Sequence, residues 1–98
     1  MNREQAIDVL RRLRSSLEAR GVAHVALFGS TARDDGDDRS DVDVVITPAE
    51  GKRLDLIDLG GVQTLLEEGF GFAVDVVVEP VRKAELRLAI QRDRADAF

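Results

Sequence analysis

Two short motifs, ten residues apart, carry side chains that could take part in phosphoryl transfer. Gly29-Ser30 is followed by ten residues and then by Asp41-Val42-Asp43. A Gly-Ser turn after a strand can present backbone N–H groups and a hydroxyl to a phosphate. Two carboxylates at positions i and i+2 of a strand point to the same face. Such a pair can hold divalent metal ions between the protein and a nucleoside triphosphate.

Two further charged residues could belong to the same site. Asp75 stands inside the apolar run 73–78, where a buried carboxylate would need a cation or hydrogen-bond donors. The alternative for Asp75 is the polar face of a half-exposed strand. Arg33 could pair with an acid of the following loop, or bind a triphosphate with both guanidinium arms.

The composition limits the class of protein. The 98 residues are expected to form one domain over 1–98, and the hydrophobic content of 44% is that of a globular chain. The net charge of −5 argues against direct nucleic-acid binding, although a basic protein partner fits it. The chain has no cysteine and no apolar run of membrane-spanning length, so we expect a cytoplasmic protein without disulfides.

Hydrophobic periodicity and turn residues divide the chain into alternating helices and strands. Apolar residues at helical spacing predict a helix over 3–20, and short apolar runs bounded by Gly or Pro predict strands. Gly69 is the expected C-terminal cap of the middle helix, and a helical turn could begin at Ser30. The predicted strands are 22–28, 42–47 and 72–78, and the predicted later helices are 54–68 and 81–93.

This order, α-β-β-α-β-α, predicts an α+β fold with a small mixed sheet. The runs Val42-Asp43-Val44-Val45 and Val74-Asp75-Val76-Val77 carry acid in the same way, which favours neighbouring strands. We expect the carboxylates on one face of the sheet and the helices on the other. His24 is expected to be a core histidine, and Asp34, Asp35, Asp37 and Asp38 a solvated loop.

Taken together, the motifs resemble the DNA polymerase β-like nucleotidyltransferase superfamily. Gly29, Ser30, Asp41 and Asp43 match its signature, including the spacing, and Asp75 stands where its third carboxylate is expected. The chain is about as long as one minimal catalytic domain. It therefore looks like the minimal nucleotidyltransferase (MNT) antitoxins that accompany HEPN-domain ribonuclease toxins.

The resemblance implies a reaction and a set of roles. Two Mg²⁺ ions would be held by Asp41 and Asp43, with Asp75 completing one site and helping as the base for an acceptor hydroxyl. The Gly29-Ser30 turn, with Arg33 as a further candidate, would bind the phosphates of ATP. AMP would pass to a tyrosine hydroxyl of the HEPN toxin, in trans, because this chain contains no tyrosine.

Two other functions remain open from the sequence. The acidic charge would also suit an antitoxin that neutralises a basic ribonuclease by binding alone. Transfer of a nucleotide to a small molecule would need an acceptor pocket, which a chain of this length could borrow by forming an oligomer. Both homo- and hetero-oligomers are compatible with the sequence.

Overall fold

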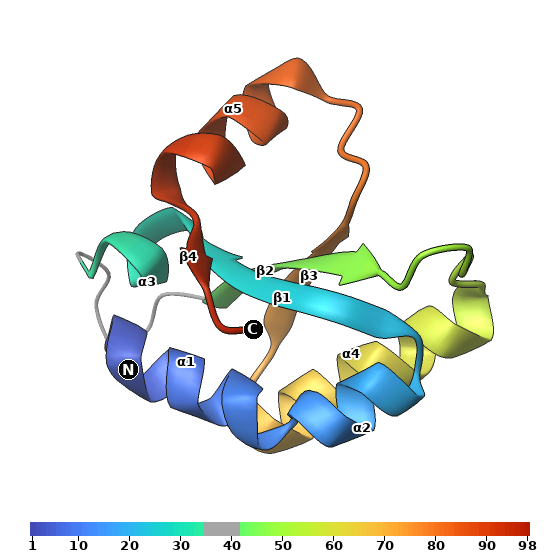
Figure 1. Cartoon of the computed structure of the whole chain (residues 1–98). Coiled ribbons are helices and arrows are strands. Elements are labelled where there is room, and N and C mark those ends of the chain that lie inside the picture. Colours follow the sequence, from blue (N-terminus) through green and yellow to red (C-terminus); the bar gives the residue numbers. More distant parts are fainter. Residues whose placement is uncertain (35–41) are drawn as a thin grey trace.

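The computed structural model describes residues 1–34 and 42–98, so the predictions for Asp35, Asp37, Asp38 and Asp41 lie outside the described residues. Helices and strands alternate through the chain (Figure 1). In chain order the elements are α1 (Arg3–Arg12), α2 (Arg14–Ala19), β1 (Val22–Phe28), α3 (Gly29–Arg33), β2 (Val42–Pro48), α4 (Leu56–Phe70), β3 (Val74–Val78), α5 (Ala84–Asp93) and β4 (Ala95–Asp96).

The described strands form a mixed sheet in the order β3-β2-β1-β4. β2 lies between β1, with which it is antiparallel, and β3, with which it is parallel. The two acid-bearing strands are thus neighbours, as the repeated sequence pattern predicted. β4 pairs with β1 at Ala26 and Leu27, and it was not predicted because two residues are too few to show an alternating pattern.

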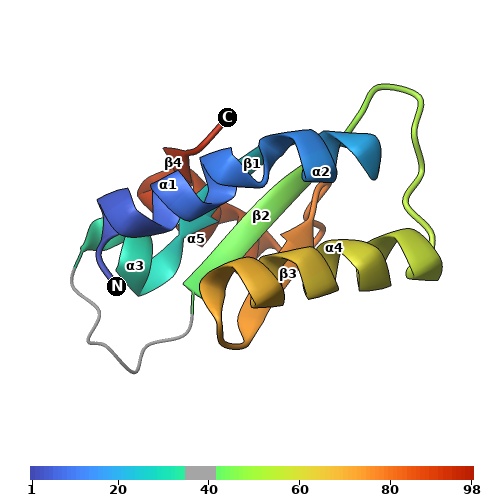
Figure 2. The ribbon, with the colours of Figure 1, turned by 90° about the horizontal axis from the view of Figure 1, so that it is seen from below.

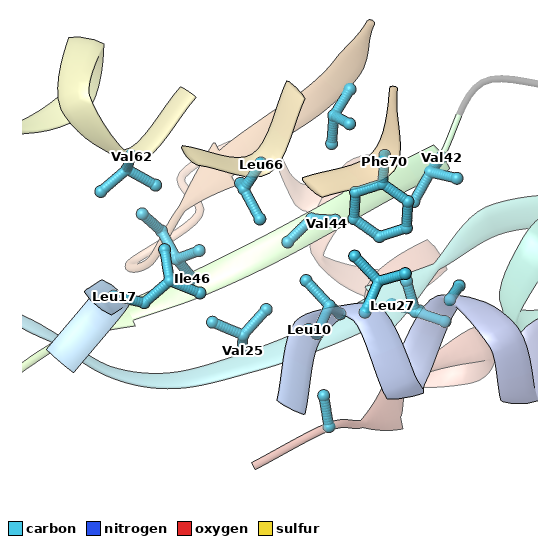
Figure 3. Packing of buried hydrophobic residues seen from close by; sticks show 14 of the residues in the cluster. Leu10, Leu17, Val25, Leu27, Val42, Val44, Ile46, Val62, Leu66 and Phe70 are labelled. Atoms are coloured by element: carbon cyan, nitrogen blue, oxygen red, sulfur yellow. The ribbon is translucent and has the colours of Figure 1, made fainter. Parts of the chain in front are cut away.

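One face of the sheet carries the main hydrophobic core. Helices α1, α2 and α4 lie side by side across this face (Figure 2). Because side chains alternate along a strand, every second residue of β1 and β2 points toward these helices. Figure 3 shows this layer, which includes Leu10, Leu17, Val25, Leu27, Val44, Ile46, Val62 and Leu66, all fully buried.

The opposite face carries a smaller core under α5. Ile90 packs with Ala26, Phe28 and Val45, which are the alternate residues of β1 and β2. The prediction that the helices lie on the face opposite the carboxylates is confirmed for α1, α2 and α4. It is wrong for α5, which packs on the face that carries the carboxylates (Figure 1). The reason is that the alternate strand residues are also apolar, so both faces need a cover.

Other differences from the sequence predictions have local causes. The helix predicted over 3–20 is present in two parts that meet at Leu13. The cap of α4 is Gly71, with φ +82°, instead of Gly69. Gly69 serves packing: a Cβ there would stand 2.6 Å from Cδ1 of Leu13. His24 is exposed, because α5 and its small core reach only the alternate positions nearer the end of β1.

No helix among residues 1–34 and 42–98 is long and apolar enough to cross a membrane.

The core assignment makes a stability prediction within α4. Leu66→Ala should lower the free energy of unfolding by about 2–5 kcal/mol, because it opens a cavity in the fully buried layer. Leu56→Ala is the matched control, since Leu56 is 88% exposed and should change stability by about 0.5 kcal/mol or less. Urea unfolding of both variants measures the difference, and equal losses would contradict the assigned packing.

Candidate functional site

The start of β2 lies at the centre of the candidate site. Asp43 is the register partner of Phe28 on β1 and of Asp75 on β3. Phe28 is the last residue of β1 and is followed at once by Gly29. The pairing therefore brings Asp43 and Asp75, on neighbouring strands, close to Gly29, the first residue after β1, although the three are far apart in the sequence.

Gly29 is required by its backbone conformation and by the nearness of Asp43. Its φ is +75°, a backbone conformation that residues other than glycine rarely adopt. A Cβ at this position would stand 2.5 Å from Oδ2 of Asp43. The half-buried carboxylate of Asp43 thus lies directly against the turn that opens α3.

Asp75 occupies the exposed side of β3. Its neighbours Val74 and Val76 point into the main core, so alternation turns Asp75 to the opposite face, which Asp43 shares. The sequence allowed a buried Asp75 or an Asp75 on the polar face of a half-exposed strand, and the structure agrees with the second. Two carboxylates in register on parallel neighbouring strands are hard oxygen donors, which suits Mg²⁺.

Ser30 lies half-buried in the first turn of α3, next to Gly29. The following residues, Thr31 and Ala32, are buried and anchor this short helix on the protein. The structure thus brings together Gly29, Ser30, Asp43 and Asp75, whereas Asp41 lies outside the described residues. Within those residues, no group of three or more acidic or histidine side chains is arranged to hold a metal ion.

Arg33 is paired with a residue that the sequence analysis did not single out. Its Nη1 donates to Oδ2 of Asp93 at 2.6 Å, although 60 positions separate the two residues. The Asp93 side chain is only 3% exposed and also accepts two hydrogen bonds from Arg92. The bonds from Arg92, and then those from Arg33, hold the pKa of Asp93 below its ordinary value against the opposing effect of burial.

Contacts from α1 hold the same end of α3. The backbone N–H of Arg3 donates to Asp34 at 3.0 Å, and its guanidinium donates to the carbonyl of Ala32 at 3.2 Å. Asp34 ends α3 in the left-handed conformation, with φ +63°. Together with the Arg33–Asp93 pair, these bonds hold the C-terminal end of α3 from two sides, so that its first residues face Asp43.

The comparison with protein families shows the family of the chain. A model described as the nucleotidyltransferase domain matches residues 10–97. The chain belongs to this family. The match includes the Gly-Ser turn, both strands with carboxylates and the helices that position them, and the chain is therefore a nucleotidyltransferase.

Known proteins agree with this assignment. The chain is 36% identical over 70 residues to the candidate protein adenylyltransferase MJ0435 of Methanocaldococcus jannaschii, covering 71% of this chain and 73% of that protein. A solved structure described as a candidate minimal nucleotidyltransferase is 29% identical, with a TM-score of 0.76 over 97% of this chain and 95% of that one. The resemblance to minimal nucleotidyltransferases is thereby confirmed.

More distant structures share the fold. One is a tri-AMPylated HEPN toxin of Shewanella oneidensis in complex with an MNT antitoxin. It is 15% identical, with a TM-score of 0.67 over 98% of this chain and 71% of that one. A toxin–antitoxin complex with AMP-PNP is 19% identical, with a TM-score of 0.71 over the whole of this chain and 73% of that one.

Two glycines allow the contact at Asp43 to be tested separately from backbone strain. Gly29 and Gly51 have φ of +75° and +74°, but nothing lies within 4 Å of a Cβ at Gly51. Gly51→Ala should cost about 1 kcal/mol of stability through strain alone. Gly29→Ala should cost more and should displace the Asp43 carboxylate. Urea unfolding compares the two variants, and an equal cost would mean that Gly29 is not packed against Asp43.

The buried acid Asp93 should give the protein a characteristic acid dependence. A carboxyl whose pKa is lowered by folding contributes stability above its unfolded pKa, near pH 4, and loses it as the pH falls through the lower folded value. The stability difference between the natural chain and Asp93→Asn should therefore be largest at neutral pH and shrink below about pH 4.

Unfolding curves between pH 2 and pH 7 measure this trend. Asp96→Asn is the control, since Asp96 also pairs with an arginine but its side chain is 68% exposed. A difference for Asp93→Asn that stays constant across this range would contradict the assignment.

Proposed function

We propose that the chain is a Mg²⁺-dependent protein adenylyltransferase that transfers AMP from ATP to a tyrosine hydroxyl of a HEPN-type toxin. It would thereby act as a cytoplasmic antitoxin. The observation that carries this proposal is the placement of Asp43 between Gly29 and Asp75. The relative from Methanocaldococcus jannaschii, a candidate protein adenylyltransferase, supports the reaction, and the MNT–HEPN complex of similar fold supports the partner.

Asp41 and Asp43 would hold two Mg²⁺ ions, with Asp75 as the third carboxylate of the set. When bound, the metal ions would neutralise the triphosphate and lower the pKa of the acceptor hydroxyl. The described part of the site fits this role, since Asp43 and Asp75 offer oxygen donors in register on one face. No cysteine or described histidine competes for a softer metal there.

The remaining groups of the site would orient the substrates. The backbone at Gly29 and the hydroxyl of Ser30 would bind the β- and γ-phosphates, because a turn without a Cβ allows the phosphates to approach closely. In the reaction, the acceptor oxygen forms a bond to the α-phosphorus and the bond to the β-phosphate oxygen breaks. Pyrophosphate leaves with those electrons, and Asp75 accepts the hydroxyl proton.

The sequence makes Arg33 a candidate phosphate ligand, but its ion pair with Asp93 favours a different role. A guanidinium held by a buried carboxylate is well suited to fix the helix that carries Ser30. We therefore propose that Arg33 positions α3, while direct phosphate binding is left to the Gly29-Ser30 turn.

A second function, neutralisation by binding alone, is favoured by the net charge of −5. An acidic protein can dock on a basic ribonuclease without any chemical step.

Intact-mass spectrometry of the proposed partner, the product of the gene next to that of this chain, separates the two functions. That product is co-expressed with the natural chain, or with its Asp41→Ala/Asp43→Ala form. AMP-sized additions that depend on the natural chain would establish transfer, whereas an unmodified, co-purifying and inactive partner would establish binding alone.

Asp43→Asn should reduce AMP transfer by about 100-fold or more, because it removes a ligand charge at the centre of the site. Stability should change little, since the side chain is only half-buried and the core is untouched. Asp8→Asn, at an exposed position on α1, is the matched control and should keep full activity. The rate of AMP incorporation and a urea unfolding curve test both halves. An unaltered rate in Asp43→Asn would refute the assigned role.

A further inference from the structure

β3 forms one edge of the described sheet, and it is also the strand that carries Asp75. An edge strand presents backbone N–H and C=O groups that can pair with another extended chain. Successive residues of a strand direct these groups alternately to the two sides. Two hydrogen bonds, one on each side of β3, therefore determine which residues direct their backbone groups outward.

On the inner side, the N–H of Glu79 donates to the carbonyl of Ile46 on β2 at 2.9 Å. On the outer side, the carbonyl of Val74 accepts a bond from Nε2 of Gln63 at 2.6 Å. Both bonds agree on one alternation: Asp75 and Val77 pair with β2, while Val74, Val76 and Val78 present their backbone groups outward. Within the described residues, only Val74 of these three has an outward bond, so Val76 and Val78 offer an open pairing edge.

The open edge lies beside the proposed catalytic carboxylate. Asp75 is exposed on the face of the sheet that Asp43 shares. A residue directly opposite on an added strand would have its Cβ about 5 Å from that of Asp75, with its side chain on the same face. We propose that the acceptor protein pairs an extended segment with the outer edge of β3 and so presents its hydroxyl-bearing side chain next to Asp75. This inference rests on the proposed function.

Charge indicates the kind of segment that fits. From Val74 to Glu79 the edge contains two acidic residues and no lysine or arginine. Glu79 is paired with Arg94 at 2.9 Å, so Asp75 supplies the negative charge of the edge itself. Glu67 lies one helical turn after Gln63, on the side of α4 that contacts the start of β3. We therefore expect a segment with basic residues around the hydroxyl. A second copy of this chain fits poorly, because pairing β3 with itself would bring like charges together.

Backbone amide exchange provides the test, with an internal control in the same strand. The natural, ¹⁵N-labelled chain is mixed with the neighbouring gene's product, and exchange is followed by NMR for each residue of β3. The backbone amides of Val76 and Val78 should exchange at least about tenfold more slowly when the partner is bound. Asp75 and Val77 should change little, because their amides already pair with β2. Slowing that appears in the chain alone and grows with its concentration would show self-pairing and overturn the proposal.

Val78→Pro supplies a second line of evidence. Proline removes an outward N–H without removing a bond to β2, and it should weaken partner binding while the unfolding curve stays cooperative. Val78→Thr is the matched control and should keep binding. If Val78→Pro does not fold, the exchange experiment on the natural chain still tests whether the partner pairs with β3.

AMP transfer, followed by intact mass in the same samples, separates this inference from the proposed function. If AMP is transferred while exchange at Val76 and Val78 is unchanged, the edge pairing is overturned. It is also overturned if the partner does not bind the chain. Slowed exchange without any transfer would support the pairing and overturn the adenylyltransferase assignment.

Discussion

The pairing of β2 with both of its neighbours is the constraint on which the site depends. β2 is antiparallel to β1 on one side and parallel to β3 on the other. The first pairing places the end of β1, and therefore Gly29, beside Asp43. The second places Asp75 in register with Asp43. A shift of one residue in either register would turn these groups to the other face of the sheet, because the side-chain period of a strand is two.

The two hydrophobic cores secure that register from both sides. The layer under α1, α2 and α4 takes one set of alternate residues, and α5 covers the other set around Phe28 and Val45. The carboxylates lie at the end of the α5 face, beyond its apolar cover. The same helix ends at Asp93, whose buried carboxylate holds Arg33, so α5 both covers the sheet and fixes the short helix that opens with Gly29.

The two carboxylates differ in their distance from the open edge of the sheet. One carboxylate, Asp43, stands in the interior of the sheet beside the glycine turn, and the other, Asp75, stands in the outermost strand. The proposed nucleotide site and the proposed acceptor site thus lie on opposite sides of the same pair of acids. In the proposed complex, the edge of the domain's own sheet would orient the partner.

The sequence by itself indicated the family and the three longer strands, and it predicted the residues of the candidate site, because a Gly-Ser turn and alternating valines are local signals. The repeated Val-Asp-Val-Val pattern also indicated that the strands of Asp43 and Asp75 are neighbours. Only the tertiary structure decided that α5 covers the carboxylate face and that β4 closes the other edge. It also showed that Gly69 serves packing and that Asp93 holds Arg33. Those facts depend on contacts between distant segments, and no local pattern records which partner a buried carboxylate or an apolar face will find.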